Sequence, residues 1–154
     1  MKATRVTVPA IRVVALSHTG PYGEIGEKFE RVWSWVGESG AEVKGCYAIY
    51  YQDPKTTPEE ELKSDACIAV SDDLVLDPKY LDLRITEIPA GDYATTAYLG
   101  PYSGLIDAWQ EFLDNAIPEA GFKLCKGVSF EQYVGDPSHD DPESLRTDLF
   151  DAIE

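Results

Sequence analysis

The chain has 154 residues, of which 44% are apolar and 11% aromatic, and its formal net charge is −15. A chain of this length buries one sizeable core, so we expect a single domain over residues 1–154. The 28 acidic residues against 13 basic ones argue against direct nucleic-acid or anionic-membrane binding, which needs clustered lysine and arginine.

No apolar run is long enough to cross a bilayer, and residues 1–14 lack the apolar stretch and cleavage site of a signal peptide. We therefore expect a cytoplasmic protein. Cys46, Cys67 and Cys125 follow no metal-ligand spacing and are expected to be reduced thiols that pack as small hydrophobic side chains. His18 and His139 are expected at the surface near loops, and no spacing predicts a metal site or a cofactor.

The first predicted element is a β-branched strand segment, Arg5–His18, which Pro9 bends or confines to a sheet edge. Gly20-Pro21-Tyr22 ends this segment, because neither a strand nor a helix interior tolerates Gly-Pro well. A helix follows, and its apolar stripe is Ile25, Phe29, Val32, Trp33 and Val36. An aromatic strand at Cys46–Tyr51 and a short strand at Asp65–Val70 complete the series.

The same order then returns. A β-branched segment at Arg84–Tyr98 contains Pro89, and Gly100-Pro101-Tyr102 opens a second helix. The apolar stripe of that helix is Leu105, Trp109, Phe112, Leu113 and Ala116. Strands at Val128–Val134 and Asp148–Ile153 close the series.

A shift of the sequence against itself supports an internal repeat. Gly20 falls on Gly100 at an offset of 80, and Tyr50 falls on Tyr133 at an offset of 83. We place the two repeats at about residues 3–76 and 82–154. The predicted class is α+β: a tandem, pseudo-twofold β-α-β-β repeat that forms an eight-stranded antiparallel sheet with two main helices and a central groove.

The repeats differ most where Glu131 stands in place of Ala48. Side chains alternate along a strand, so Glu131 and Tyr133 point to one face, and Ala48 and Tyr50 to the equivalent face of the other repeat. A carboxylate walled by tyrosines needs a cation or a hydrogen-bond donor when it is buried. From the residues alone, Glu131 is a cation receptor, a general acid or base, or a structural residue in a salt bridge or on an exposed sheet face.

The aromatic residues divide into two groups. Trp33, Trp109, Phe29 and Phe112 lie on the apolar stripes of the helices and are expected in the core. Trp35 lies off the stripe, and Tyr22 and Tyr102 open the helices, so these three are expected to line the groove. Aromatic faces above a carboxylate suit a flat organic cation.

Together these motifs resemble the GyrI-like small-molecule-binding family, which includes the DNA gyrase inhibitor protein and the effector-binding domains of transcription regulators. The resemblance runs over the Gly-Pro-Tyr corner, FERVWSWV, YYQDPKTTPEEELKSD, GDYA, AWQEF and FEQYVGDP. It implies a tandem β-α-β-β fold whose central groove meets cationic drugs at Glu131. It also implies Trp35 and Trp109 as groove aromatics, while the helix-turn-helix segment of the regulators is not seen here.

Three functions follow as hypotheses. In the first, the protein binds an aromatic cation through Glu131, Tyr133, Tyr50, Trp35, Trp109, Tyr22 and Tyr102. In the second, which the resemblance implies, Glu131 is the general base of a hydrolase of strained cyclopropyl electrophiles; no nucleophile-base pair is visible, so the residues favour a binding protein. In the third, also implied by the resemblance, the acidic protein inhibits DNA gyrase by direct contact.

Overall fold

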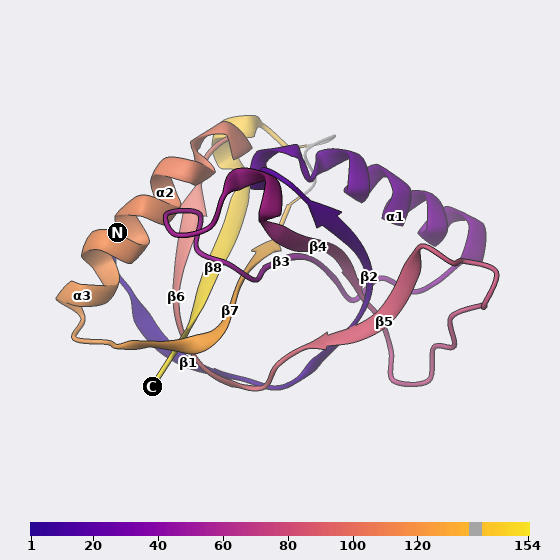
Figure 1. Cartoon of the computed structure of the whole chain (residues 1–154), viewed down its shortest axis with the longest axis horizontal. Helices are drawn as coiled ribbons and strands as arrows, with labels where there is room; N and C mark the ends of the chain where they lie inside the picture. Colours follow the sequence, from indigo (N-terminus) through magenta and orange to yellow (C-terminus); the bar gives the residue numbers. More distant parts are fainter. Residues whose placement is uncertain (136–139) are drawn as a thin grey trace. The chain divides into compact units, whose positions relative to one another are not determined.

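The computed structural model describes residues 1–135 and 140–154, which form two compact units. Unit 1 joins Met1–Pro9 to Ala90–Glu154, and unit 2 is Ala10–Pro89. In the described residues each unit has four antiparallel strands and one main helical segment, eight strands in all (Figure 1). The predicted α+β class with a repeated order of elements is confirmed.

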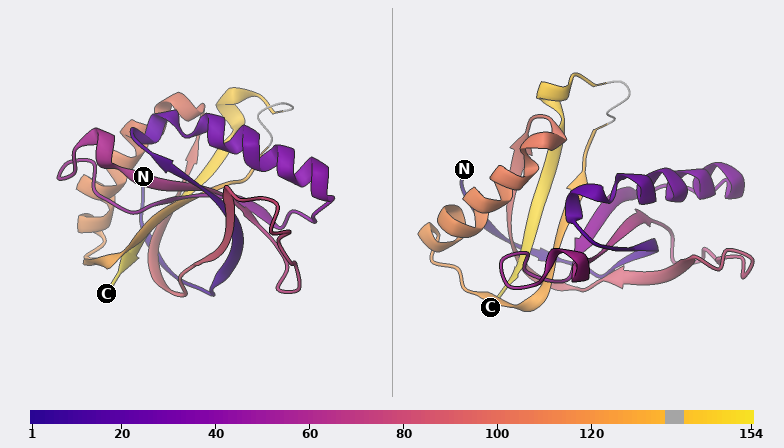
Figure 2. Two further views of the ribbon diagram at one scale, coloured as in Figure 1. Left: turned by 45° about the vertical axis from the view of Figure 1, so that its right-hand side comes forward. Right: turned by 45° about the horizontal axis from the view of Figure 1, so that its top comes forward.

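Unit 2 contains four strands in the order β3-β4-β2-β5. They are β2 (Ile11–Thr19), β3 (Gly45–Tyr50), β4 (Lys63–Ala69) and β5 (Leu83–Ile88). The helix α1 (Gly26–Ser39) follows a single 3-10 turn at Tyr22–Glu24, and another such turn lies at Glu59–Glu61. The helix lies along one face of these strands (Figure 2).

Unit 1 repeats this plan with the order β1-β6-β8-β7. Its strands are β1 (Thr4–Val8), β6 (Gly91–Leu99), β7 (Leu124–Tyr133) and β8 (Arg146–Ile153). Its helical segment has a 3-10 turn (Tyr102–Gly104), α2 (Leu105–Glu111), a π-helical turn (Phe112–Ala116) and α3 (Ile117–Glu119), and a 3-10 turn at Pro142–Ser144 precedes β8. The predicted stripe packs as expected, with Phe112 and Ala116 buried against Leu149 of β8.

The first strand of each sequence repeat belongs to the other unit. Strand β1 pairs with β6 of unit 1, and β5 pairs with β2 of unit 2. The break falls at Pro9 and Pro89, each just after the last residue of a strand, where a residue without an N–H ends the ladder at no cost. Each predicted β-branched segment is therefore two strands, and the units do not coincide with the repeats.

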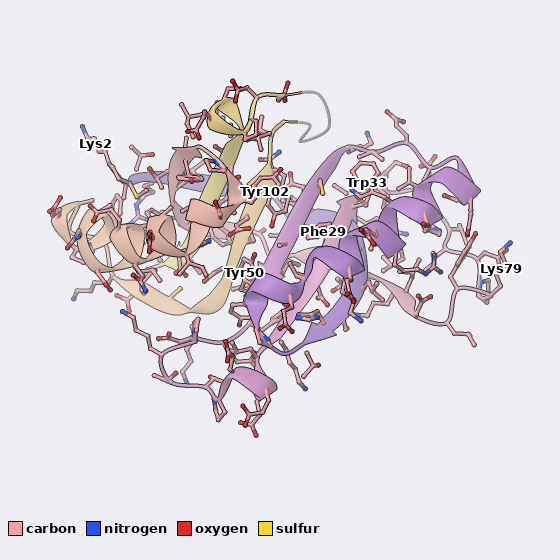
Figure 3. The ribbon with its side chains drawn as sticks, turned by 90° about the horizontal axis from the view of Figure 1, so that it is seen from above. Lys2, Phe29, Trp33, Tyr50, Lys79 and Tyr102 are labelled. Atoms are coloured by element: carbon pink, nitrogen blue, oxygen red, sulfur yellow. The ribbon has the colours of Figure 1, made fainter. Side chains whose placement is uncertain are left out.

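The buried face of α1 differs from the predicted stripe. Trp35 is 2% exposed and Val32 is fully buried, whereas Trp33 is 45% exposed (Figure 3). Residues three apart share a helix face, while Trp33 is turned by about 100° from Val32. The prediction that Trp33 lies in the core is thus wrong, and the buried apolar face of α1 is turned toward Trp35.

Candidate functional site

Glu131 of β7 is the centre of the candidate site in unit 1. Its side chain is 2% exposed and lies opposite Leu149 of β8, which packs against the helical segment of the same unit. Because cross-strand partners share a sheet face, the Glu131 carboxylate also points toward that segment. Alternation along β7 puts Tyr133 on the same face.

Two neutral donors hold this carboxylate. The Trp109 indole Nε1 of α2 donates to Oε1 at 2.5 Å, and the Tyr133 hydroxyl donates to Oε2 at 2.6 Å. Hydrogen bonds to an ionised acceptor are short and about twice as strong as neutral ones, so they offset part of the cost of burying the charge. Neither of these two donors carries a charge of its own. We call Glu131, Trp109 and Tyr133 the carboxylate cluster.

A third aromatic residue extends the cluster toward solvent. The ring of Tyr102 lies 5.5 Å from the ring of Tyr133, edge to face. Tyr102 is 37% exposed and opens the helical segment directly after Pro101, where Figure 3 labels it. Four of the seven predicted ligand-binding residues, Glu131, Tyr133, Trp109 and Tyr102, are thus brought together in unit 1.

Tyr22 and Tyr50 form a ring pair of their own in unit 2. Their centroids are 4.6 Å apart, and the Tyr22 hydroxyl donates to the backbone carbonyl of Gln52 at 2.7 Å. Burial raises the pKa of the Tyr22 phenol above its ordinary value. The position equivalent to Glu131 is Ala48, which is fully buried. For Tyr22 and Tyr50, ligand contact stays a prediction.

Trp35 is a packing residue in the described structure. Trp35 lies on α1 and is buried. Val14 of β2 and Ile68 of β4 are buried as well. Trp35 was expected to line the groove because it lies off the predicted stripe, and for Trp35, too, ligand contact stays a prediction.

Two expectations for other chemical groups need correction. His18 is not a surface residue: it is 7% exposed on β2, and its Nε2 bonds to the Pro21 carbonyl at 2.9 Å. His139 lies outside the described residues. Of the expected buried thiols Cys67 is buried, Cys46 is half-buried and Cys125 is exposed. Within residues 1–135 and 140–154, no cluster of three or more His, Cys, Asp and Glu side chains could hold a metal ion.

Another buried carboxylate, which the sequence pattern did not single out, is that of Asp65 of β4, which is 1% exposed. Arg84 of β5 donates to both of its oxygens, at 3.0 and 2.5 Å, and the Tyr51 hydroxyl donates at 2.5 Å. Burial and the bond to Asp65 raise the pKa of Tyr51 well above its ordinary value. The available signal in the sequence was a charged residue inside an otherwise apolar strand. The partner of Asp65, which is Arg84, could not be predicted, because it depends on which strands are neighbours in the sheet.

A model of the family described as GyrI-like small molecule binding domain matches residues 1–153. The chain is 29% identical over 145 residues to a DNA gyrase inhibitor of Yersinia enterocolitica, a match that covers 93% of this chain and 91% of that one. It is 28% identical over 129 residues to a DNA gyrase inhibitor of Serratia proteamaculans, covering 82% and 83% of the two chains.

Two solved structures share the fold. The C-terminal domain of EcmrR matches with a TM-score of 0.81 at 19% identity, over 99% of this chain and 97% of that one. SAV2435, in a structure with bound tetraphenylphosphonium, matches with a TM-score of 0.64 at 10% identity, over 100% and 94% of the two chains. In the part of the chain that the structure describes, no helix is both long and apolar enough to cross a membrane.

Proposed function

Because the chain belongs to the GyrI-like small molecule binding domain family, we propose that it binds an aromatic cation at the carboxylate cluster of unit 1. The observation that carries this proposal is the Glu131 carboxylate, 2% exposed and held by the neutral donors Trp109 and Tyr133. A negative charge in a site of low dielectric acts strongly on a nearby cation.

The aromatic rings supply the rest of the recognition. Trp109 and Tyr133 each present a ring beside the carboxylate, and Tyr102 is partly exposed next to Tyr133. A cation over an aromatic face gains about 0.5 to 2 kcal/mol, depending on desolvation. The ligand would contact these rings, with the carboxylate beneath them. The tetraphenylphosphonium bound to SAV2435 is a cation of this type and supports the choice of ligand class.

The test is a calorimetric titration of tetraphenylphosphonium into the wild type and Glu131→Gln, with the neutral triphenylphosphine oxide as a comparison ligand. The glutamine keeps an oxygen acceptor but removes the charge, so affinity for the cation should fall by roughly 1 to 3 kcal/mol. Glu119→Gln removes an exposed carboxylate of the same unit and should change nothing. Equal affinity of wild type and Glu131→Gln would rule out the carboxylate as the cation receptor.

A second candidate function is inhibition of DNA gyrase through protein contact. The observations that favour it are the net charge of −15 and the relatives named DNA gyrase inhibitors, which align over most of this chain. An acidic surface steers association with a basic protein face. The test is a supercoiling assay with purified DNA gyrase, and no inhibition at large molar excess would remove this candidate.

A further inference from the structure

The connection between β4 and β5, residues 70–82, carries the two most exposed large apolar side chains that the structure describes. Val75 is 88% exposed and Leu81 is 93% exposed. We call residues 70–82 the connector. Connections of this length without regular structure are uncommon in compact domains and are usually functional, and binding residues concentrate on loops held by a rigid scaffold.

The backbone of the connector is held in place at both ends. The Arg12 guanidinium of β2 donates to the Leu74 carbonyl at 2.6 Å, and Arg31 of α1 forms a 2.8 Å ion pair with Asp82. The guanidinium of Arg31 also lies 5.7 Å from the centre of the Tyr80 ring. These contacts come from two different elements of unit 2, so they fix the path of the loop.

Turns within the connector add local order. The Leu74 amide donates to the Ser71 carbonyl at 3.2 Å, and the Lys79 amide donates to the Asp77 carboxylate at 3.0 Å. Leu74 and Leu76 are partly buried while Val75 between them points outward. An apolar side chain on a pre-ordered backbone loses little conformational entropy when it binds, which favours affinity.

The charged side chains of the connector itself are mostly acidic, while Arg12 and Arg31 contact it from β2 and α1. The connector contains four aspartates, Asp72, Asp73, Asp77 and Asp82, and one lysine, Lys79, which Figure 3 shows at its outer end. A hydrogen bond from Ser71 lowers the pKa of the Asp73 carboxyl, and Arg31 lowers that of Asp82. Because a second copy of this chain carries the same acidic surface, charge complementarity selects a basic partner.

We propose that the connector is a docking element for a protein surface that has an apolar hollow with a rim of lysine and arginine. Val75 and Leu81 enter the hollow, and Asp72 and Asp77 meet the rim. This inference rests on the second candidate function, and purified DNA gyrase is the partner with which we test it. An apolar centre within a charged rim is the usual arrangement of a specific protein interface.

The experiment compares the inhibition of supercoiling, and direct binding to immobilised gyrase, by the wild type and four variants. Val75→Ser/Leu81→Ser removes the apolar anchors and should weaken both readouts by at least about tenfold, the loss expected for two central interface residues. Ile106→Ser removes an apolar side chain of α2 that is 67% exposed and should behave as wild type. Because all three side chains are mostly exposed, the variants should fold normally, which circular dichroism checks.

The third variant tests the charges. Asp72→Asn/Asp77→Asn keeps the side-chain acceptor at position 77 and should weaken binding about threefold at low salt and less at high salt. Its matched control, Asp107→Asn/Glu119→Gln, removes two exposed carboxylates of unit 1.

The outcomes separate the connector from the function on which it rests. If Val75→Ser/Leu81→Ser inhibits supercoiling as strongly as the wild type, the connector is not the docking element. Inhibition of gyrase by the protein would still stand. Failure of the wild type to bind or inhibit gyrase overturns both. Self-association of the wild type that is lost in Val75→Ser/Leu81→Ser, measured by sedimentation, would show that a second copy is the occupant and overturn the basic partner.

Discussion

Units 1 and 2 share one backbone frame. Tyr133 pairs with Thr147 in unit 1 as Tyr50 pairs with Ser64 in unit 2. The corners after the second strand also agree: the Tyr98 hydroxyl donates to the Pro101 carbonyl, and His18 bonds to the carbonyl of Pro21. The frame is therefore repeated, while the side chains placed on it differ.

The most buried carboxylates that the structure describes in the two units, Glu131 in unit 1 and Asp65 in unit 2, have different hydrogen-bond partners. Glu131 of unit 1 accepts hydrogen bonds from Trp109 and Tyr133, which are neutral. Asp65 of unit 2 is held by the cation Arg84. Because Arg84 neutralises the carboxylate that it holds, we infer a structural role for Asp65. The binding role of Glu131 belongs to our proposal and is tested by Glu131→Gln.

The largest expected effect comes from copying the carboxylate of unit 1 into unit 2. Ala48→Glu puts a charge at a fully buried position where the repeat supplies Phe29 in place of Trp109, and we expect a loss of about 3 to 5 kcal/mol in the free energy of unfolding. Urea denaturation measures it. Adding Phe29→Trp should recover about 1 to 2 kcal/mol of the lost free energy of unfolding. If Ala48→Glu alone costs less than about 1 kcal/mol, unit 2 already accommodates the charge and the prediction is wrong.

The second effect contrasts the ion pairs of the two units. Arg84→Ala leaves the Asp65 carboxylate, whose side chain is 2% exposed, without its cation, and should cost about 2 to 3 kcal/mol. In unit 1, Arg146 pairs with Asp148, and the Arg146 side chain is 53% exposed. Arg146→Ala should therefore cost less than about 1 kcal/mol. Thermal and urea unfolding of both variants give the comparison, and equal costs would contradict it.

A smaller effect is expected when unit 1 is made to resemble unit 2. Trp109→Phe copies Phe29 and removes the indole donor to Glu131, which should cost about 1 to 2 kcal/mol of stability. Trp109→His, which keeps a ring N–H, is the matched variant and should recover part of the loss if the hydrogen bond is the cause. If both variants are as stable as wild type, the bond contributes nothing.

The sequence allowed the repeat and the α2 stripe to be predicted, since alternation and helical spacing are local properties. The offset of 83 agrees with the pairing of Tyr50 with Ser64 and of Tyr133 with Thr147. The alternation rule also placed Glu131 beside Tyr133. The exchange of β1 and β5 between units was not predictable, because Pro9 and Pro89 mark a break in the strand but not its pairing partner.

The remaining errors have specific physical causes. On α1, Trp33 and Trp35 lie about 200° apart around the helix axis and so make two nearly opposite faces apolar, and the stripe alone does not decide which of these faces is buried. The Asp65–Arg84 pair depends on β5 lying beside β2 in the sheet, which is a property of strand order. The Trp109–Glu131 bond depends in turn on how α2 packs on β7.

The last prediction is expected to leave stability unchanged and concerns thiol reactivity. Burial raises the pKa of the Cys46 thiol of unit 2 to about 12, although a hydrogen bond from Trp33 lowers it, and burial also raises the pKa of Cys67. Cys125 of unit 1 is exposed. Since the thiolate is the nucleophile, iodoacetamide at pH 8 should label Cys125 first, as peptide mass spectrometry will show. Labelling of Cys46 should accelerate about tenfold per pH unit from 8 to 10, because only the deprotonated fraction changes there. A rate that levels off within that range would mean that Cys46 is not desolvated and that β3 is as open at Cys46 as β7 is at Cys125.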